Sequence, residues 1–297
     1  MNPSKNFKIL STFDEVVNKY EAFIIDIWGV LWDGIEPYHY SIESLKKLMA
    51  LNKYVILLSN APRRAEVVSS RLDNIGIDSS YYNKIISSGE ICRLKFLKNQ
   101  TLLNKFGCTY YFIGQSQDQT ITEFLNLTET KNIKKADFIL VCGTRNFEDT
   151  LDDYIRELDL ALAYRLPFIC ANPDKVVIRK TGELLICAGA MADYYKKKGG
   201  LVYQYGKPFL ETYQLCVDHL NQEYKKINKS NILCVGDSLE TDILGANQFG
   251  LNSLLITNGI HKNELHTNNS LISKINMKKF FENKEIAPEY VLQEFIF

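Results

Sequence analysis

Apolar runs short enough for strands alternate with segments of helical periodicity along the first third of the chain. Between these runs, apolar side chains recur every three or four positions, the spacing of one helix face. This alternation is typical of βαβ units and a parallel sheet, so it predicts an α/β fold with a Rossmann-like core. The predicted strands are Ala22–Asp26, Tyr54–Ser59 and Lys84–Ser87, and the helical positions are Ile42, Leu45, Leu48, Met49, Ala65, Val68, Leu72 and Ile75.

The rest of the chain repeats this pattern in two further sets of strands. A stretch of lysines and glycines at residues 196–200 separates the two sets and is interpreted as a solvated helix end and hinge. We therefore expect a discontinuous core, residues 1–88 and 201–297, with a second α/β unit at 89–200 inserted as a cap domain. The predicted strands are Thr109–Ile113, Asp137–Cys142, Pro167–Ala171, Leu201–Tyr205, Asn231–Val235 and Ser253–Thr257.

Composition narrows the class of ligand. The length of 297 residues favours about two domains, and a 46% share of apolar residues excludes a disordered chain. Lysine plus arginine balance aspartate plus glutamate, 35 against 35, so no net positive field attracts a nucleic acid or an anionic membrane. The longest apolar runs have five residues, whereas a membrane span needs about 20. A small molecule is the expected partner.

The cysteines and the N-terminus bear on the compartment. The seven cysteines are scattered and never spaced C-x-x-C, which argues against both a disulfide framework and a zinc site. An acidic residue precedes any apolar segment at the N-terminus, so no secretory signal is visible. Reduced thiols in the cytoplasm are the simplest interpretation.

Polar side chains stand where the predicted strands end. Asp26 ends the first strand, Ser59 and Asn60 end the second, Asp237 follows the strand ILCVG, and Lys207 lies in a Gly-Lys-Pro turn. Ligands bind open parallel sheets at the carboxyl ends of the strands. Two carboxylates, a hydroxyl and an ammonium at one rim form a consistent set for phosphate chemistry with a metal ion.

Four segments with these residues resemble, in order, the four motifs of the haloacid dehalogenase-like superfamily, the aspartate-nucleophile hydrolases. The segments are DIWGVLWDG at 26–34, LLSN at 57–60, YGKP at 205–208 and GDSLETDILGA at 236–246. The predicted insertion after the second motif, with ANPD at 171–174 inside it, is similar to the subclass with a large α/β cap. That subclass contains sugar phosphatases, phosphoglycolate phosphatases and pyridoxal phosphatases.

The resemblance implies a Mg²⁺-dependent phosphatase of small phosphorylated metabolites that forms an aspartyl-phosphate. Asp26 would be the nucleophile, and Mg²⁺ would be held by Asp26, Asp237 and the main-chain carbonyl of Trp28. Asp242 would complete the metal site through a bound water or would hold Lys207. Such a site suits Mg²⁺, which takes oxygen ligands in octahedral geometry.

The remaining site candidates are substrate-binding groups. Asn172 and Asp174, in the inserted unit, are the candidates for substrate specificity. The groups expected to surround the phosphoryl oxygens are Ser59, Asn60, Lys207 and the main-chain N–H groups of Ile27 and Trp28.

Trp28 departs from the pattern of the resembled phosphatases. They carry at this position a second aspartate, which protonates the leaving oxygen and then activates the hydrolytic water. An indole cannot fill this role. Loss of such an acid typically costs about 10²- to 10⁴-fold in rate, so we expect weak or specialised turnover. Asp33, in the loop after the nucleophile, is the nearest candidate for a substitute acid.

Two alternatives stay open. A binding or regulatory protein would keep the phosphate and Mg²⁺ sites without turnover. A dehalogenase-type hydrolase also carries an aromatic residue at the position of Trp28, but it works without Mg²⁺ and lacks the acidic pair that Asp237 and Asp242 provide. The sequence leaves open the substrate and the choice between monomer and homodimer.

Overall fold

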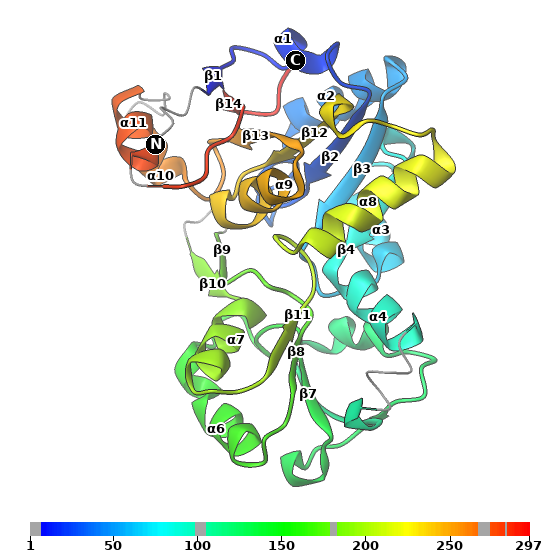
Figure 1. Ribbon diagram of the computed structural model, residues 1–297, viewed down its shortest axis with the longest axis vertical. Coiled ribbons are helices and arrows are strands. Elements are labelled where there is room, and N and C mark those ends of the chain that lie inside the picture. The colour runs from blue at the N-terminus through cyan, green and yellow to red at the C-terminus, as the bar shows by residue number, and fades with distance from the viewer. Residues whose placement is uncertain (1–6, 99–104, 179–182, 267–273, 283) are drawn as a thin grey trace.

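The computed structural model describes residues 7–98, 105–178, 183–266, 274–282 and 284–297. Its larger sheet has seven strands, all parallel (Figure 1). In sheet order they are β1 (Lys8–Ile9), β14 (Tyr290–Leu292), β13 (Asn252–Ile256), β12 (Ile232–Gly236), β2 (Ala22–Asp26), β3 (Tyr54–Ser59) and β4 (Lys84–Ser87). The predicted α/β fold with a Rossmann-like core is confirmed.

Helices cover both faces of this sheet. They are α1 (Asp14–Val17), α2 (His39–Ala50), α3 (Ala65–Asn74), α8 (Leu210–Glu223), α9 (Leu244–Phe249), α10 (Lys262–Leu265) and α11 (Lys274–Phe281). Phe23 and Ile25 of β2 share a hydrophobic cluster with Leu45 of α2, whereas Ile24 shares one with Cys216 of α8. Alternate strand residues face opposite sides of a sheet, so β2 is buried throughout, and its first four residues form a continuous apolar run before Asp26.

Helix length bears on the membrane question. The longest helix in the described part of the chain, α8, has 14 residues. None of the described helices combines the length and the apolar character needed to cross a membrane.

A second, smaller sheet lies in the other half of the molecule (Figure 1). Its parallel strands are, in sheet order, β11 (Val202–Gln204), β8 (Phe168–Cys170), β7 (Phe138–Val141), β5 (Thr109–Ile113) and β6 (Thr128–Glu129). Two helices, α6 (Ile155–Ala163) and α7 (Ala188–Lys197), bury Leu158 and Met191 on one face. On the other face, Phe96 of α4 (Ser88–Lys98) stacks on Phe138, with 5.8 Å between ring centroids.

A short antiparallel pair, β9 (Val176–Ile178) and β10 (Leu184–Ile186), lies between the two sheets in Figure 1. The sequence analysis predicts neither strand. All three residues of β9 are half-buried, and β10 begins a five-residue apolar run, residues 184–188, that continues into α7. Such a run does not distinguish a strand from the start of a helix. Hydrophobic patterning therefore gives little signal for this pair.

The division into a core at 1–88 and 201–297 and a cap at 89–200 stays a prediction, with one correction. Among the described residues of 89–200, none contributes a strand to the seven-stranded sheet. The predicted strand Leu201–Tyr205, however, was expected to belong to the core. The structure pairs β11 with β8 in the smaller sheet. An apolar run marks a strand without identifying the sheet to which it belongs.

Candidate active site

The candidate residues meet at the carboxyl edge of the larger sheet. Asp26 is the last residue of β2, and Ser59 is the last residue of the neighbouring β3. Asp237 directly follows β12, which pairs with the other side of β2. Because these strands are parallel neighbours, their ends lie at one edge. Lys207 reaches the same place from the chain that leaves β11 and enters α8.

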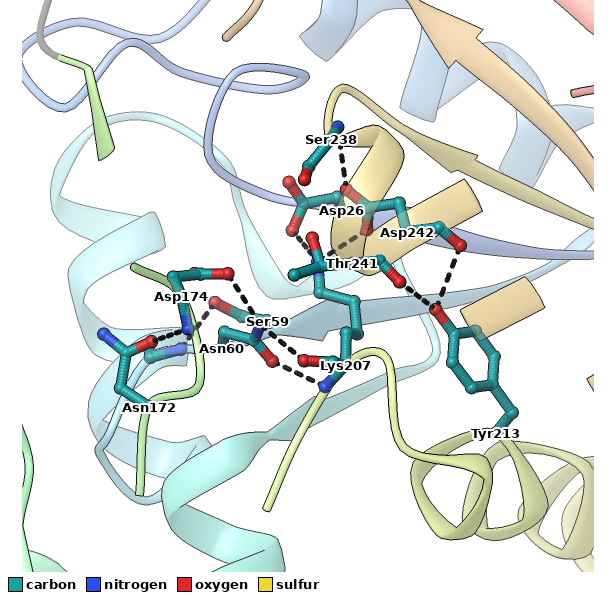
Figure 2. A network of polar contacts seen from close by, with 11 residues as sticks. Asp26, Ser59, Asn60, Asn172, Asp174, Lys207, Tyr213, Ser238, Thr241 and Asp242 are labelled. Carbon is teal, nitrogen blue, oxygen red and sulfur yellow. Dashed lines mark hydrogen bonds and ion pairs between the residues drawn. The ribbon is translucent and has the colours of Figure 1, made fainter. Parts of the chain in front are cut away.

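The ammonium of Lys207 lies between two carboxylates, as Figure 2 shows. Its Nζ is 2.5 Å from Oδ1 of Asp26 and 2.7 Å from Oδ1 of Asp242, and all three side chains are at least nine-tenths buried. Burial alone would lower the pKa of Lys207, but the carboxylates of Asp242 and Asp26 outweigh it and raise that pKa. Lys207 is therefore a fixed positive charge at the edge of the sheet.

Three carboxylates form a cluster beside this ammonium. Asp26, Asp237 and Asp242 offer oxygen atoms that all lie within 4.8 Å of one another. The N–H of Ile260 donates to Oδ2 of Asp237 (2.8 Å), and the N–H of Ser238 donates to Oδ2 of Asp242 (3.2 Å). Main-chain donors thus orient the two carboxylates of the cluster that follow β12 in the chain.

The surroundings of this cluster fit a small cation with oxygen ligands. A side chain at Gly29 or Gly259 would collide with the Asp237 carboxylate, and one at Gly236 would collide with Asp242. Burial, together with the Asp242 charge, raises the pKa of Asp237 to about 7. Buried carboxylates that repel one another are stabilised by a cation, and Mg²⁺ prefers such ligands.

Asn60 connects the core to the smaller sheet (Figure 2). Its Oδ1 accepts the N–H of Lys207 (2.7 Å), and its Nδ2 donates to the Lys207 carbonyl (3.1 Å) and to Oδ1 of Asp174 (2.8 Å). Oδ1 of Asn172 accepts the N–H of Asp174 (3.1 Å). A side chain at Gly206, where φ is +120°, would collide with Asn60. The turn therefore requires glycine before Lys207.

A cavity of about 410 Å³ opens over these groups. Its lining includes the acidic cluster, Ser59, Asn60, Asp174 and Lys207, together with Trp28 and all three residues of β9. We call it the polar cavity. Nε1 of Trp28 donates to the carbonyl of Ile178 in β9 (2.9 Å), which closes one wall.

A second cavity of about 180 Å³, which we call the side chamber, adjoins the polar cavity. The two share the wall residues Trp28, Ser59, Asn60, Asp174 and Val177. Beyond that wall, α3 contributes apolar side chains, and Arg63, paired with Asp118 at 2.6 Å, also lines the chamber.

Comparison with known families decides the class of protein. A model of the haloacid dehalogenase-like hydrolases matches residues 23–128, and a model described as HAD-hydrolase-like matches residues 204–292. Together these segments contain Asp26, Ser59, Lys207, Asp237 and Asp242. The chain belongs to the haloacid dehalogenase-like hydrolases.

Relatives of this haloacid dehalogenase-like hydrolase match along most of their length. A 4-nitrophenylphosphatase from Schizosaccharomyces pombe is 24% identical, over 85% of this chain and 88% of its own. The ribonucleotide monophosphatase NagD from Escherichia coli is 25% identical, over 80% and 87%. A haloacid dehalogenase-like hydrolase from Brucella suis has a crystal structure that superposes with a TM-score of 0.82 at 27% identity, over 97% of this chain and 100% of that one.

Three further residues of this hydrolase, the sequence-predicted Ile27 and Asp33 among them, have structural partners. Ile27 packs its side chain into the core, and its carbonyl accepts the N–H groups of Leu31 and Trp32. Asp33 lines the polar cavity, but its Oδ1 accepts the N–H groups of two residues of the same loop, Ile35 and Glu36. His261, which directly precedes α10, accepts the N–H of Leu239 at Nε2 (3.2 Å).

The wall formed by β9 is the part of the site that sequence reasoning missed. Val176, Val177 and Ile178 line the polar cavity, although no chemical motif marks them. The ANPD motif, which only Lys175 separates from this strand, is the signal that could have located it. A loop that places Asp174 at the site necessarily carries the next residues over it.

Proposed function

We propose that this hydrolase is a Mg²⁺-dependent phosphatase of small phosphorylated metabolites that forms an aspartyl-phosphate on Asp26. The observation that carries the proposal is the buried ammonium of Lys207 between Asp26 and Asp242 on the floor of the polar cavity. An anionic phosphate can approach a carboxylate nucleophile only where positive charge compensates for both. The phosphatase names of the relatives support the same reaction class.

The metal ligands would be Asp26, Asp237 and the main-chain carbonyl of Trp28, with Asp242 beside them. Bound there, Mg²⁺ would supply the positive charge that lets a phosphoryl group approach Asp26. The acidic cluster and the glycines packed against it support this assignment.

The other groups would bind and orient the phosphoryl oxygens. Lys207 neutralises charge that develops on them, and the N–H groups of Ile27 and Trp28 donate to them. Ser59 accepts the N–H of Ala61 at Oγ (3.1 Å), which leaves its hydroxyl hydrogen to donate to the phosphoryl group. Asp26 attacks phosphorus, the ester oxygen departs, and water then releases phosphate from the aspartyl-phosphate.

The part of the substrate beyond the phosphate would lie against the cap. Asn172 and Asp174 line the side chamber, and Asp174 also lines the polar cavity. A leaving group placed in the side chamber would touch both residues and the apolar residues of α3. We assign specificity to this wall.

The experiment is hydrolysis of 4-nitrophenyl phosphate by the protein with added Mg²⁺ and with a chelator. Turnover that requires Mg²⁺ and that Asp26→Asn abolishes supports the proposal. Mg²⁺ binding without turnover of 4-nitrophenyl phosphate, acetyl phosphate or a panel of sugar phosphates would instead indicate a binding protein. Metal-independent release of halide from a haloacid would indicate a dehalogenase.

A further inference from the structure

In the proposed phosphatase function, on which this inference rests, the site needs a proton donor that Trp28 does not supply. An alkoxide is a poor leaving group, so its oxygen must receive a proton as the P–O bond breaks. The indole N–H of Trp28 does not release its proton near neutral pH. It already donates a hydrogen bond to the carbonyl of Ile178. Another side chain must carry this proton.

Five carboxyl groups line the polar cavity in the described part of the chain: Asp26, Asp33, Asp174, Asp237 and Asp242. Asp26, Asp237 and Asp242 form the acidic cluster and are committed to the nucleophile and the cation. Oδ1 of Asp33 accepts the N–H groups of Ile35 and Glu36, which hold that carboxyl against its own loop. Asp174 remains.

Asp174 is held in one place by both parts of the molecule. From the core side, Nδ2 of Asn60 donates to its Oδ1 at 2.8 Å. From the cap side, its carbonyl accepts the N–H of Gly189 at the start of α7 (3.0 Å), and a side chain at Gly189 would collide with that carbonyl. Figure 2 shows Asp174 beside Asn60, on the same side of the site as Ser59. The carboxyl is therefore fixed over the phosphate end of the cavity.

Its place between the two cavities matches the place of an ester oxygen. The polar cavity is lined by the residues that bind the phosphoryl group in the proposed mechanism, and the side chamber offers space for the rest of the substrate. Asp174 lines both. An oxygen that joins a phosphoryl group at Asp26 to a leaving group in the side chamber must pass this shared wall.

The surroundings of Asp174 favour its protonated form. Burial raises the pKa of this carboxyl above its usual range, and neither Lys207 nor the Asn60 hydrogen bond reverses that direction. The other carboxyl oxygen is then available to carry a proton while Oδ1 accepts from Asn60.

We propose that Asp174 is the general acid and base of this hydrolase. Its carboxyl gives a proton to the ester oxygen as Asp26 forms its bond to phosphorus, and the alcohol departs. The resulting carboxylate then takes a proton from the water that attacks the aspartyl-phosphate. Inorganic phosphate leaves, Asp26 returns to its carboxylate form and Asp174 to its acid form.

The test compares leaving groups in Asp174→Asn, which keeps the size of the side chain and an acceptor for Asn60. 4-Nitrophenolate departs without protonation, so this variant should release a burst of about one 4-nitrophenolate per site at close to the parent rate. Steady-state turnover should then be slow, because activation of the water is lost. Release of glycerol from glycerol 3-phosphate should fall by about 10²- to 10⁴-fold without a burst.

The matched control is Asp193→Asn, which makes the same change on α7. Asp193 forms an ion pair with Lys175, next to Asp174, but does not line either cavity. Its glycerol 3-phosphate rate should stay at the parent level.

Each other outcome overturns the inference. A proton-transfer role would be excluded if Asp174→Asn hydrolysed glycerol 3-phosphate at the parent rate. It would also be excluded if the substitution reduced the 4-nitrophenolate burst rate and glycerol release by the same factor. A leaving-group dependence that appears in Asp33→Asn instead would exclude it too. A parent protein that does not hydrolyse 4-nitrophenyl phosphate with Mg²⁺ would overturn the proposed function itself, an outcome distinct from the failure of Asp174 alone.

Discussion

The indole of Trp28 and the carbonyl of Ile178 are joined by a hydrogen bond of 2.9 Å across 150 residues of chain. The bond connects the loop that follows Asp26 at the end of β2 to the strand β9, which lines the polar cavity. The ring itself packs edge-on against Trp32, with 5.1 Å between centroids, and a side chain at Gly34 would collide with it. Trp28 thus joins the loop after β2 to β9 directly beside the proposed nucleophile.

Trp28→Phe keeps a ring at this position but removes the donor. One hydrogen bond contributes about 0.5–1.5 kcal/mol, so the arrangement in which β9 lines the polar cavity should become about two- to tenfold less favoured. We expect KM for 4-nitrophenyl phosphate to rise by a similar factor. Steady-state kinetics measure this, and a thermal melt checks folding. An unchanged KM in a folded variant would mean that the bond does not hold β9 over the polar cavity.

Trp28→Asp tests where the proton comes from. If Asp174 is the acid, the double variant that combines Trp28→Asp with Asp174→Asn should regain part of the glycerol 3-phosphate turnover that Asp174→Asn alone loses. Removal of the indole leaves a cavity that costs a few kcal/mol, so melting temperatures must accompany the rates. A folded double variant no faster than Asp174→Asn alone would show that a carboxyl at position 28 cannot reach the ester oxygen.

The sequence predicted the edge of the larger sheet better than the wall above it. Asp26, Ser59 and Asp237 end parallel neighbouring strands, and strand ends are readable from apolar runs. Ile178 is different, because nothing in a half-buried three-residue strand indicates a partner 150 residues away. β11 shows the same limit: its residues predict a strand but not its pairing with β8. Contacts between the two sheets depend on how their parts pack, which periodicity does not record.

The metal-free protein should lose stability as pH rises. Burial and the Asp242 charge raise the pKa of Asp237 to about 7 in the folded state, above its usual value of 3.8. Between these two values the folded protein binds a proton that the unfolded chain has released. Stability therefore falls by up to about 1.4 kcal/mol per pH unit above pH 3.8, and this loss is complete once pH passes 7. The pKa values of Asp174 and His261 are also raised, so both groups act in the same direction.

Thermal melts between pH 5.5 and 8 with a chelator measure this effect. The melting temperature should fall across that range, and the slope should be smaller in Asp237→Asn. Mg²⁺ added at pH 8 should raise the melting temperature of the parent, because it binds the folded state. A melting temperature that rises from pH 5.5 to 8 without metal would contradict the assignment.

Val67→Phe tests the side chamber. Val67 lies on α3, is only partly buried and lines the chamber, so a larger ring there should narrow it without disrupting the core. KM for 1-naphthyl phosphate should rise several-fold, whereas acetyl phosphate, whose leaving group is small, should keep its parent kinetics. Equal effects on both substrates would mean that the leaving group lies elsewhere.

The nucleophile is the centre of this account. The most direct measurement is acid quenching of the protein with Mg²⁺ and 4-nitrophenyl phosphate within one turnover, followed by peptide mass spectrometry. The account predicts a phosphoryl group on the peptide that contains Asp26, absent in Asp26→Asn, whose turnover should fall by at least about 10³-fold. Phosphate release by Asp26→Asn at the parent rate, with no phosphorylated peptide in either protein, would contradict it.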